Sequence, residues 1–312
     1  MSKLKGLLLT EGLHGMISQV EGLAKALDLD YFHEKIELNI PWNLIPPSFT
    51  PTKKFVFKNK INKDYDVIIS CGRKSIIPSI FLKKNSNKKI VNIHIQNPKV
   101  SPKYFDFVIA PDHDSIHGSN VIISKGAIHY LTINEIEEAK DYLENKIEKE
   151  KDVLTLILGG PTKYYKYSNE NIIQIFSKIN KQILEKNLQL IVIPSNRTPV
   201  KIIQFAKEYF GKNQLIVDTV DKQAYLSSLA LAKYIIVTCD SSSMISEAAL
   251  TGKPLYVATI PAIRSDKRFQ KFRNLLEGMN IIRKLEDELD TWNYEKLDET
   301  NRIAKQIKVK LS

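Results

Sequence analysis

Short apolar runs alternate with helical patterns along this chain, in two successive series, and this alternation restricts the possible folds more than any other feature. The apolar runs of the second series are continuous, as in parallel strands that are covered on both faces. Repeated strand–helix units of this length form right-handed crossovers and doubly wound sheets. The predicted strands are 153–158, 188–194, 214–217, 234–238 and 254–258, and the predicted helices are 169–186, 200–210, 221–231 and 242–251. We therefore predict an α/β fold.

The first series has the same character. Its predicted strands are 4–10, 66–70, 89–95, 105–110 and 120–124, and its predicted helices are 17–27 and 75–83. The charged stretch 134–150 follows it with little to bury, and we interpret this stretch as a long helix that links two domains. The predicted fold class is thus α/β, with two Rossmann-like doubly wound domains facing across a cleft. The domains are 1–150 and 151–293, and a helix within 294–312 could pack back on the first domain.

A net charge of +11 over 312 residues points to either a nucleic acid or a membrane as a partner class. The lysines, however, are spread along the entire chain, as in KKNSNKKI from Lys83, which is typical of solvated faces. The chain has no basic stripe with interleaved aromatic residues and no zinc-finger or helix-turn-helix spacing, so we predict no nucleic-acid binding. A weak affinity for anionic lipid surfaces stays open.

No stretch approaches the ~18 apolar residues that a membrane-spanning helix needs. The apolar run Leu7–Leu9 is too short for the core of a signal peptide and belongs to the first predicted strand. The two cysteines, Cys71 and Cys239, have neither the number nor the spacing of a disulfide framework or a zinc site. We therefore expect a cytoplasmic protein, which a peripheral association could hold at the inner face of a membrane.

The segment AKYIIVTCDSSSMISEAALTGKPLYV, residues 232–257, combines a strand, a polar turn and a short helix. A helix that begins among small hydroxyl residues offers unpaired N–H groups and the positive end of its dipole to a diphosphate. Glu247, farther along the helix, could accept hydrogen bonds from ribose hydroxyls. Helix capping explains the turn residues equally well, and this alternative stays open. The candidate nucleotide-sugar ligands of this segment are Asp240, Ser241, Ser242, Ser243 and Glu247.

Two further strand ends of the second domain carry chemistry that suits a phosphate. The glycines at 159–160 let the backbone approach a phosphate closely, although a plain tight turn would use them too. In SNRTP, capping explains the hydroxyl residues but not the arginine. Because the carboxyl ends of parallel strands meet at one edge, the three strand ends together predict a nucleotide site. Its candidate ligands from these two turns are Gly159, Gly160, Thr162, Lys163, Ser195 and Arg197.

The loop TEGLHG after the first strand places His14 at the edge of the first domain. Histidine titrates near neutral pH, so His14 could act as a general base on an acceptor hydroxyl. A plain surface histidine is the alternative. Further candidates on the acceptor side lie in turns, or in the basic stretch after Pro261, where a solvated helix face is the alternative. They are Glu11, Arg73, Gln96, Asn97 and Arg264.

The cluster Asp112-His113-Asp114 with His117 has the composition of a metal site. No further ligand with suitable spacing is visible, so we predict no metal. The chain has no P-loop lysine motif, which disfavours hydrolysis of nucleoside triphosphates. We predict no cofactor, because a nucleotide-sugar would be a substrate.

Seven segments, in chain order, resemble the mitochondrial-fission family named for its elongated-mitochondria plant mutant, and in particular its bacterial branch. They are TEGLHGMISQVEGLAKAL, IHIQNPK, APDHD, SKGAIHYL, GGPTKYY, SNRTP and VTCDSSSMISEA. The resemblance spans nearly the whole chain. That family is similar in turn to glycosyltransferases of the two-Rossmann-domain B type, including the lipid-linked peptidoglycan N-acetylglucosaminyltransferase. One departure is that relatives often begin with an Asp-Gly-Arg-like turn, where this chain has Thr10-Glu11-Gly12-Leu13.

The resemblance implies a nucleotide-diphosphate sugar in the interdomain cleft and metal-independent transfer of the sugar to a hydroxyl acceptor. It places Gly159, Gly160 and Ser241–Ser243 by the diphosphate, Glu247 at the ribose and His14 at the position of a catalytic or acceptor-side histidine. A lipid or membrane-surface acceptor and a protein partner are both compatible with it. Two alternatives stay open. One is a non-catalytic adaptor, since the plant relatives recruit a dynamin-type fission protein, and the other is a nucleotide-sugar epimerase with the same fold.

Overall fold

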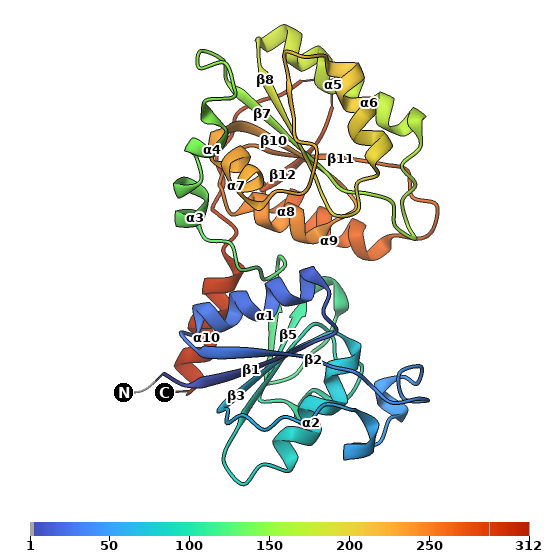
Figure 1. Cartoon of the computed structure of the whole chain (residues 1–312), viewed down its shortest axis with the longest axis vertical. Coiled ribbons are helices and arrows are strands. Elements are labelled where there is room, and N and C mark those ends of the chain that lie inside the picture. The colour runs from blue at the N-terminus through green and yellow to red at the C-terminus, as the bar shows by residue number, and fades with distance from the viewer. Residues whose placement is uncertain (1–2, 287, 312) are drawn as a thin grey trace. The chain divides into compact units, whose positions relative to one another are not determined.

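The computed structural model describes residues 3–286 and 288–311, and the chain divides into two compact units (Figure 1). The first unit comprises Met1–Tyr130 and Asp298–Ser312, and the second comprises Leu131–Leu297. The division thus falls earlier than the one predicted after residue 150, and residues 131–150 pack within the second unit. The C-terminal helix belongs to the first unit.

The first unit contains a six-stranded sheet in the order β2-β1-β3-β4-β5-β6, and every neighbouring pair is parallel. Its strands are β1 (Lys5–Thr10), β2 (Asp30–Lys35), β3 (Val67–Cys71), β4 (Val91–Ile95), β5 (Phe107–Pro111) and β6 (Val121–Ser124). Its α-helices are α1 (His14–Ala26), α2 (Ile76–Lys84) and α10 (Glu299–Leu311). The central strands are continuously buried, as their continuous apolarity predicts.

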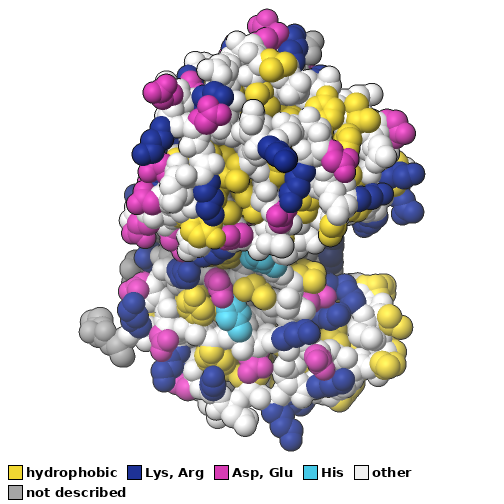
Figure 2. Space-filling view, turned by 45° about the horizontal axis from the view of Figure 1, so that its top comes forward, with side chains coloured by type: hydrophobic (Ala, Val, Ile, Leu, Met, Phe, Trp, Pro, Cys, Tyr) yellow, Lys and Arg dark blue, Asp and Glu magenta, His cyan; other side chains and the backbone are white. Residues whose placement is uncertain are grey.

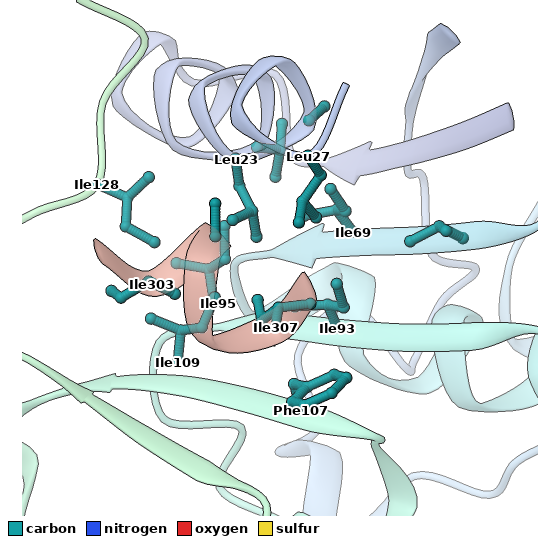
Figure 3. Close-up of a cluster of buried hydrophobic side chains, with 14 of the residues drawn as sticks. Leu23, Leu27, Ile69, Ile93, Ile95, Phe107, Ile109, Ile128, Ile303 and Ile307 are labelled. Carbon is teal, nitrogen blue, oxygen red and sulfur yellow. The ribbon is translucent and has the colours of Figure 1, made fainter. Parts of the chain in front are cut away.

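A cluster of buried side chains joins the sheet of this unit to α1 and α10 (Figure 3). Leu23 of α1 and Ile93 of β4 are fully buried in it. Ile303 and Ile307 of α10 are also fully buried there, although they come from the far end of the chain. The last helix therefore completes the core of the first unit rather than lying on its surface.

The second unit contains another parallel sheet, in the order β12-β11-β10-β7-β8-β9. Its strands are β7 (Val153–Leu158), β8 (Gln189–Pro194), β9 (Leu215–Ile216), β10 (Ala232–Thr238), β11 (Leu255–Ala258) and β12 (Ile282–Lys284). Its helices are α3 (Ile133–Glu138), α4 (Asp141–Glu144), α5 (Asn169–Lys186), α6 (Val200–Phe210), α7 (Lys222–Leu231), α8 (Ser242–Ala249) and α9 (Lys267–Gly278). The predicted α/β class with two doubly wound sheets is confirmed.

The single long helix predicted over 134–150 is wrong, because two short helices, α3 and α4, occupy this stretch. Ser227 of α7 explains the break. Its hydroxyl donates to the carbonyl of Lys140 at 2.7 Å and accepts from the N–H of Leu143 at 3.0 Å. These backbone groups would pair within a continuous helix. The stretch is therefore folded onto α7 and does not serve as a free linker.

Charged side chains of both signs are interspersed over the face shown in Figure 2. This distribution agrees with the interpretation of the lysine-rich composition as solvated surface. Among residues 3–286 and 288–311, no helix is both long and apolar enough to cross a bilayer.

Candidate functional site

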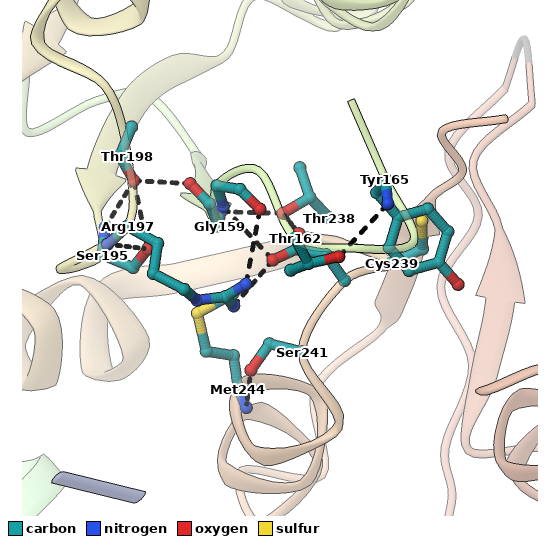
Figure 4. Close-up of polar contacts among 12 residues, drawn as sticks. Gly159, Thr162, Tyr165, Ser195, Arg197, Thr198, Thr238, Cys239, Ser241 and Met244 are labelled. Atoms are coloured by element: carbon teal, nitrogen blue, oxygen red, sulfur yellow. Dashed lines mark hydrogen bonds and ion pairs between the residues drawn. The ribbon is translucent and has the colours of Figure 1, made fainter. Parts of the chain in front are cut away.

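The turn after β7 packs so closely that only glycine fits at two successive positions (Figure 4). The N–H of Gly159 donates to the hydroxyl of Thr238 at 2.8 Å, and that of Gly160 donates to the Asp240 carboxylate at 3.2 Å. A Cβ on Gly159 would lie 2.2 Å from both Asp240 carboxylate oxygens, and one on Gly160 would lie 1.9 Å from the carbonyl oxygen of Arg197. The glycines thus bring three strand ends together.

The Asp240 carboxylate is the centre of this arrangement. Its side chain is fully buried, and it accepts hydrogen bonds from the hydroxyls of Thr238, at 2.7 Å, and Tyr167. It also forms an ion pair with Arg197, in which Nη2 lies 2.7 Å from Oδ2. Burial, and then the neighbouring Asp240, raise the pKa of the Tyr167 phenol, which keeps this group protonated as a donor. The buried Asp240 carboxylate therefore holds both the glycine turn after β7 and the Arg197 guanidinium in place.

Arg197 extends from this buried carboxylate toward the surface. Its Nη1 donates to the carbonyl of Gly160 at 3.3 Å, while 39% of its side chain stays exposed. A guanidinium carries five N–H donors, so those turned to solvent can still bind an anion. The cation is thereby fixed in direction next to the glycine backbone.

The turn after β8 holds the backbone of Arg197 in place. The Thr198 hydroxyl donates to the carbonyls of Leu158, at 2.8 Å, and Gly159, at 2.6 Å. The same hydroxyl accepts from the N–H of Ser195 at 2.8 Å, and the Ser195 hydroxyl accepts from the N–H of Arg197 at 3.3 Å. Ser195 thus serves the turn, and Thr198, which was not among the predicted ligands, ties that turn to the glycines.

Helix α8 begins directly after this cluster. The Ser241 hydroxyl caps it by accepting from the N–H of Met244 at 3.3 Å. The N–H groups of Ser242 and Ser243 lie in the first turn and have no acceptor inside the helix. Both residues are half-buried, so the start of the helix combines partial exposure with the positive end of the dipole.

Glu247 lies four residues after Ser243, on the same face of α8. It is half-buried, and its Oε2 accepts a hydrogen bond from the hydroxyl of Tyr225 on α7 at 2.8 Å. Burial raises the pKa of the Glu247 carboxyl to about 7, against the smaller opposing effect of the Tyr225 hydrogen bond. The carboxyl therefore changes charge near neutral pH.

The predicted ligands Thr162 and Lys163 lie in the loop after the glycines. The Thr162 hydroxyl accepts from the N–H groups of Tyr164, at 3.1 Å, and Tyr165, at 3.2 Å, so it closes a turn. Lys163 is exposed, with its Nζ 5.0 Å from the centre of the Tyr164 ring.

A second polar cluster, Tyr165 with Asp266 and Arg273, anchors this loop. The buried hydroxyl of Tyr165 donates to the Asp266 carboxylate at 2.5 Å and accepts from Arg273 at 3.0 Å. Arg273 also pairs with Asp266 at 3.1 Å. This cluster was not predicted from the sequence, because Tyr165 and Asp266 are 101 residues apart and neither directly follows a strand.

In the first unit, His14 begins α1 and is exposed, with its ring nearly parallel to that of Tyr130 and 6.2 Å from it, centre to centre. The Glu11 carboxylate accepts from the backbone N–H of Lys74 at 3.1 Å and lies 3.5 Å from the Lys74 ammonium. The structure thus brings Glu11 to the turn that also contains Arg73. The Arg73 guanidinium, however, donates to backbone carbonyls of the loop between β2 and β3.

Gln96 and Asn97 follow β4. Gln96 adopts a φ of 88°, and its N–H donates to the carbonyl of Ile109 at 2.7 Å. The Asn97 side chain accepts from the N–H of Lys99 at 3.0 Å. Arg264 is exposed in the second unit, so it does not share a unit with the other acceptor-side candidates.

The residues Asp112–Asp114 form a short 3-10 helix after β5. In the described part of the chain, no three His, Cys, Asp or Glu side chains gather closely enough to hold a metal ion.

Comparison with known proteins identifies the family of this chain. The family described as mitochondrial fission ELM1 matches residues 14–311. The chain belongs to this family. The match confirms the resemblance inferred from the seven sequence segments.

Two relatives are similar to this chain over most of its length. A Rickettsia prowazekii protein described as uncharacterized is 29% identical over 285 residues, which cover 79% of this chain and 80% of the relative. The mitochondrial fission protein ELM1 of Arabidopsis thaliana is 23% identical over 275 residues, which cover 79% of this chain and 64% of the plant protein. This ELM1-family chain therefore spans less than two thirds of the plant protein.

Solved structures share the fold. The UDP-GlcNAc 2-epimerase of Neisseria meningitidis, bound to UDP-GlcNAc, is 12% identical with a TM-score of 0.53, and the match covers 99% of each chain. The catalytic domain of starch synthase IV from Arabidopsis thaliana is 10% identical with a TM-score of 0.50, covering 99% of this chain and 98% of that one. The ELM1-family chain thus has the B-type glycosyltransferase fold, which epimerases also use.

Proposed function

We propose that the second unit binds a nucleotide-diphosphate sugar at the carboxyl edge of its sheet and that the protein transfers the sugar to a hydroxyl acceptor. One observation carries the proposal. The Arg197 guanidinium is held by a fully buried carboxylate, stays 39% exposed, and lies against a glycine backbone that admits no Cβ. Such a cation, fixed in direction and with N–H donors still exposed, suits a diphosphate.

The start of α8 supplies the second half of the proposed diphosphate site. The unpaired N–H groups of Ser242 and Ser243 and the helix dipole favour negative charge. When the sugar leaves the diphosphate, negative charge grows on the leaving oxygen, and preorganised donors stabilise it. Arg197 and the helix start supply such donors, so the scheme routes no step through a metal.

In this proposal Glu247 and His14 keep the roles that the sequence predicts. Glu247 would accept from ribose hydroxyls when ionised, because an ionised carboxylate is the stronger acceptor. Its raised pKa then makes nucleotide binding weaken as the pH falls through about 7. His14 would take the proton of the acceptor hydroxyl as general base.

The test is calorimetric titration with uridine, guanosine, cytidine and thymidine diphosphates and their sugars. We expect one base to bind, and Arg197→Ala to weaken that binding about 10- to 100-fold, as for the loss of a charged hydrogen bond. Glu247→Gln, which keeps the shape of the side chain and its hydrogen bond from Tyr225, should weaken the binding of the same ligand. Lys212→Ala is the matched control, since Lys212 is exposed in the second unit and precedes β9, away from the carboxyl edge.

The reaction products distinguish sugar transfer from epimerisation and from a non-catalytic adaptor. Release of nucleoside diphosphate that depends on an added acceptor, and that His14→Ala abolishes without loss of donor binding, supports transfer. A changed sugar on an intact nucleotide would instead identify an epimerase. A folded protein that binds none of these nucleotides would refute the donor site and leave the adaptor.

A further inference from the structure

The three most exposed large hydrophobic side chains among the described residues all belong to the loop between β2 and β3. Ile40 is 82% exposed, and Leu44 and Phe49 are each 79% exposed. Phe55, in the same loop, is 59% exposed. We refer to these four residues as the apolar tip. Scattered surface hydrophobics are ordinary, but four large ones in sixteen consecutive residues indicate a contact surface.

The backbone of this loop is pinned at several points. Leu38 and Phe57 form an antiparallel bridge, and the Asn39 side chain donates to the carbonyl of Phe55 at 2.7 Å. From outside the loop, the Arg73 guanidinium donates to the carbonyl of Ile45 at 3.0 Å and to that of Asn43. A compact loop with joined ends loses little conformational freedom when its tip binds a partner. The apolar tip is thus held outward by a fixed backbone.

The same loop is strongly cationic. Residues 36–63 contain five lysines and a single acidic residue, Glu37, which pairs with Lys58 at 3.5 Å. These lysines are Lys53, Lys54, Lys58, Lys60 and Lys63, and all are exposed. The charge complement of this surface is therefore an anionic partner.

We propose that the loop over residues 36–63 is a contact for anionic lipid bilayers. The apolar tip would enter the boundary between headgroups and acyl chains, and the lysines would bind the headgroups. A fluid bilayer accommodates separately protruding side chains, whereas a protein partner needs a matching pocket for each. The contact does not depend on the nucleotide site. If the proposed transfer holds, Arg73 and Glu11 place this contact beside the predicted acceptor side, which favours a lipid-borne acceptor.

Flotation of the full chain with vesicles tests the proposal. One vesicle set contains phosphatidylcholine alone, and the other contains phosphatidylglycerol in addition. We expect binding to the anionic set and a loss of at least about ten-fold in Ile40→Ser/Leu44→Ser/Phe49→Ser, because each apolar side chain contributes to insertion. The matched control is Leu184→Ser/Val200→Ser, whose targets are 73% and 70% exposed in the second unit. All five positions are exposed, so we expect the variants to fold.

Charge is tested separately. Replacing Lys53, Lys54 and Lys58 by Gln should weaken binding to the anionic vesicles by about five-fold per lysine. Replacing the exposed Lys149, Lys166 and Lys212 by Gln, which lowers the net charge equally, should leave binding nearly unchanged.

The depth of the contact has its own readout. The two tryptophans of the chain, Trp42 and Trp292, lie in the loop and in the second unit, respectively. In a Trp292→Phe variant, bromine-labelled lipid should quench the fluorescence of Trp42, and in Trp42→Phe it should leave Trp292 unquenched. Unchanged flotation of the apolar-tip variant would overturn the proposal. So would failure of the natural chain to bind anionic vesicles, which would leave an acidic protein as the occupant.

Discussion

Gly160→Ala tests the turn on which the proposed site depends. The added methyl group would lie 1.9 Å from the carbonyl oxygen of Arg197 and 2.7 Å from its Cβ, well inside the 3.4 Å at which ordinary contact begins. The nearest atoms belong to backbone, so no flexible side chain can give way. Overpacking of this kind costs about 1–3 kcal/mol, and weakening the hydrogen bond from Gly160 to the Asp240 carboxylate adds about 1.5–3 kcal/mol. We expect a loss of about 2.5–6 kcal/mol in the free energy of unfolding of the second unit.

Urea unfolding, followed by the fluorescence of Trp292 in a Trp42→Phe background, measures this loss, since Trp292 belongs to the second unit. Gly278→Ala is the control, because a Cβ there meets nothing within 4 Å at the end of α9. We expect that variant to be unchanged or more stable by up to about 1 kcal/mol. A Gly160→Ala protein within about 1 kcal/mol of its parent, below the range for overpacking, would refute the close packing of the turn.

Three further predictions address other parts of the chain. Burial raises the pKa of Glu247 from 4.5 to about 7. Between these pH values the folded state holds a proton on Glu247 that the unfolded chain has lost, so the free energy of unfolding falls as the pH rises from 4.5 through 7. In urea titrations Glu247→Gln should reduce this fall in the free energy of unfolding. An equal dependence on pH in the two proteins would contradict the raised pKa of Glu247. Tyr165→Phe should cost about 1–3 kcal/mol by removing a partner from a buried ion pair, whereas Tyr164→Phe should be nearly neutral; equal melting temperatures would contradict this. Ile303→Ala should destabilise the first unit by about 2–5 kcal/mol in chemical denaturation, and the exposed Val309→Ala by much less; a neutral Ile303→Ala would contradict its place in the core.

The sequence predicts the central strands well but misses one edge strand of each sheet, for a physical reason. Strands buried on both faces need continuous apolarity, and β3, β4, β7, β8 and β10 show it. At one edge, β2 reads DYFHEK and is only partly buried, so its composition does not distinguish it from a loop. At one edge of the sheet in the second unit, β12 has only three residues. Neither strand can be predicted from its residues, because backbone pairing rather than apolarity defines both.

The candidate site shows the same limit. The rule that parallel strands end at one edge correctly predicts the approach of Gly160, Arg197 and Asp240. It does not predict that Asp240 faces inward, since a strand-end carboxylate can point either way. Tyr167 and Thr198 support the turn from loop positions, and only the folded backbone brings them there. Sequence therefore predicts which strand ends meet more reliably than which of their side chains point into the protein.

The return of α10 to the first unit determines the order in which the two units can finish folding during synthesis. The second unit, Leu131–Leu297, is one continuous segment and can fold as soon as it leaves the ribosome. The first unit lacks Ile303 and Ile307 until α10 has been translated, and until then the cluster around Leu23 and Ile93 is incomplete. The unit that is translated first is therefore completed last. A nascent chain stalled before residue 298 should expose this apolar surface to chaperones.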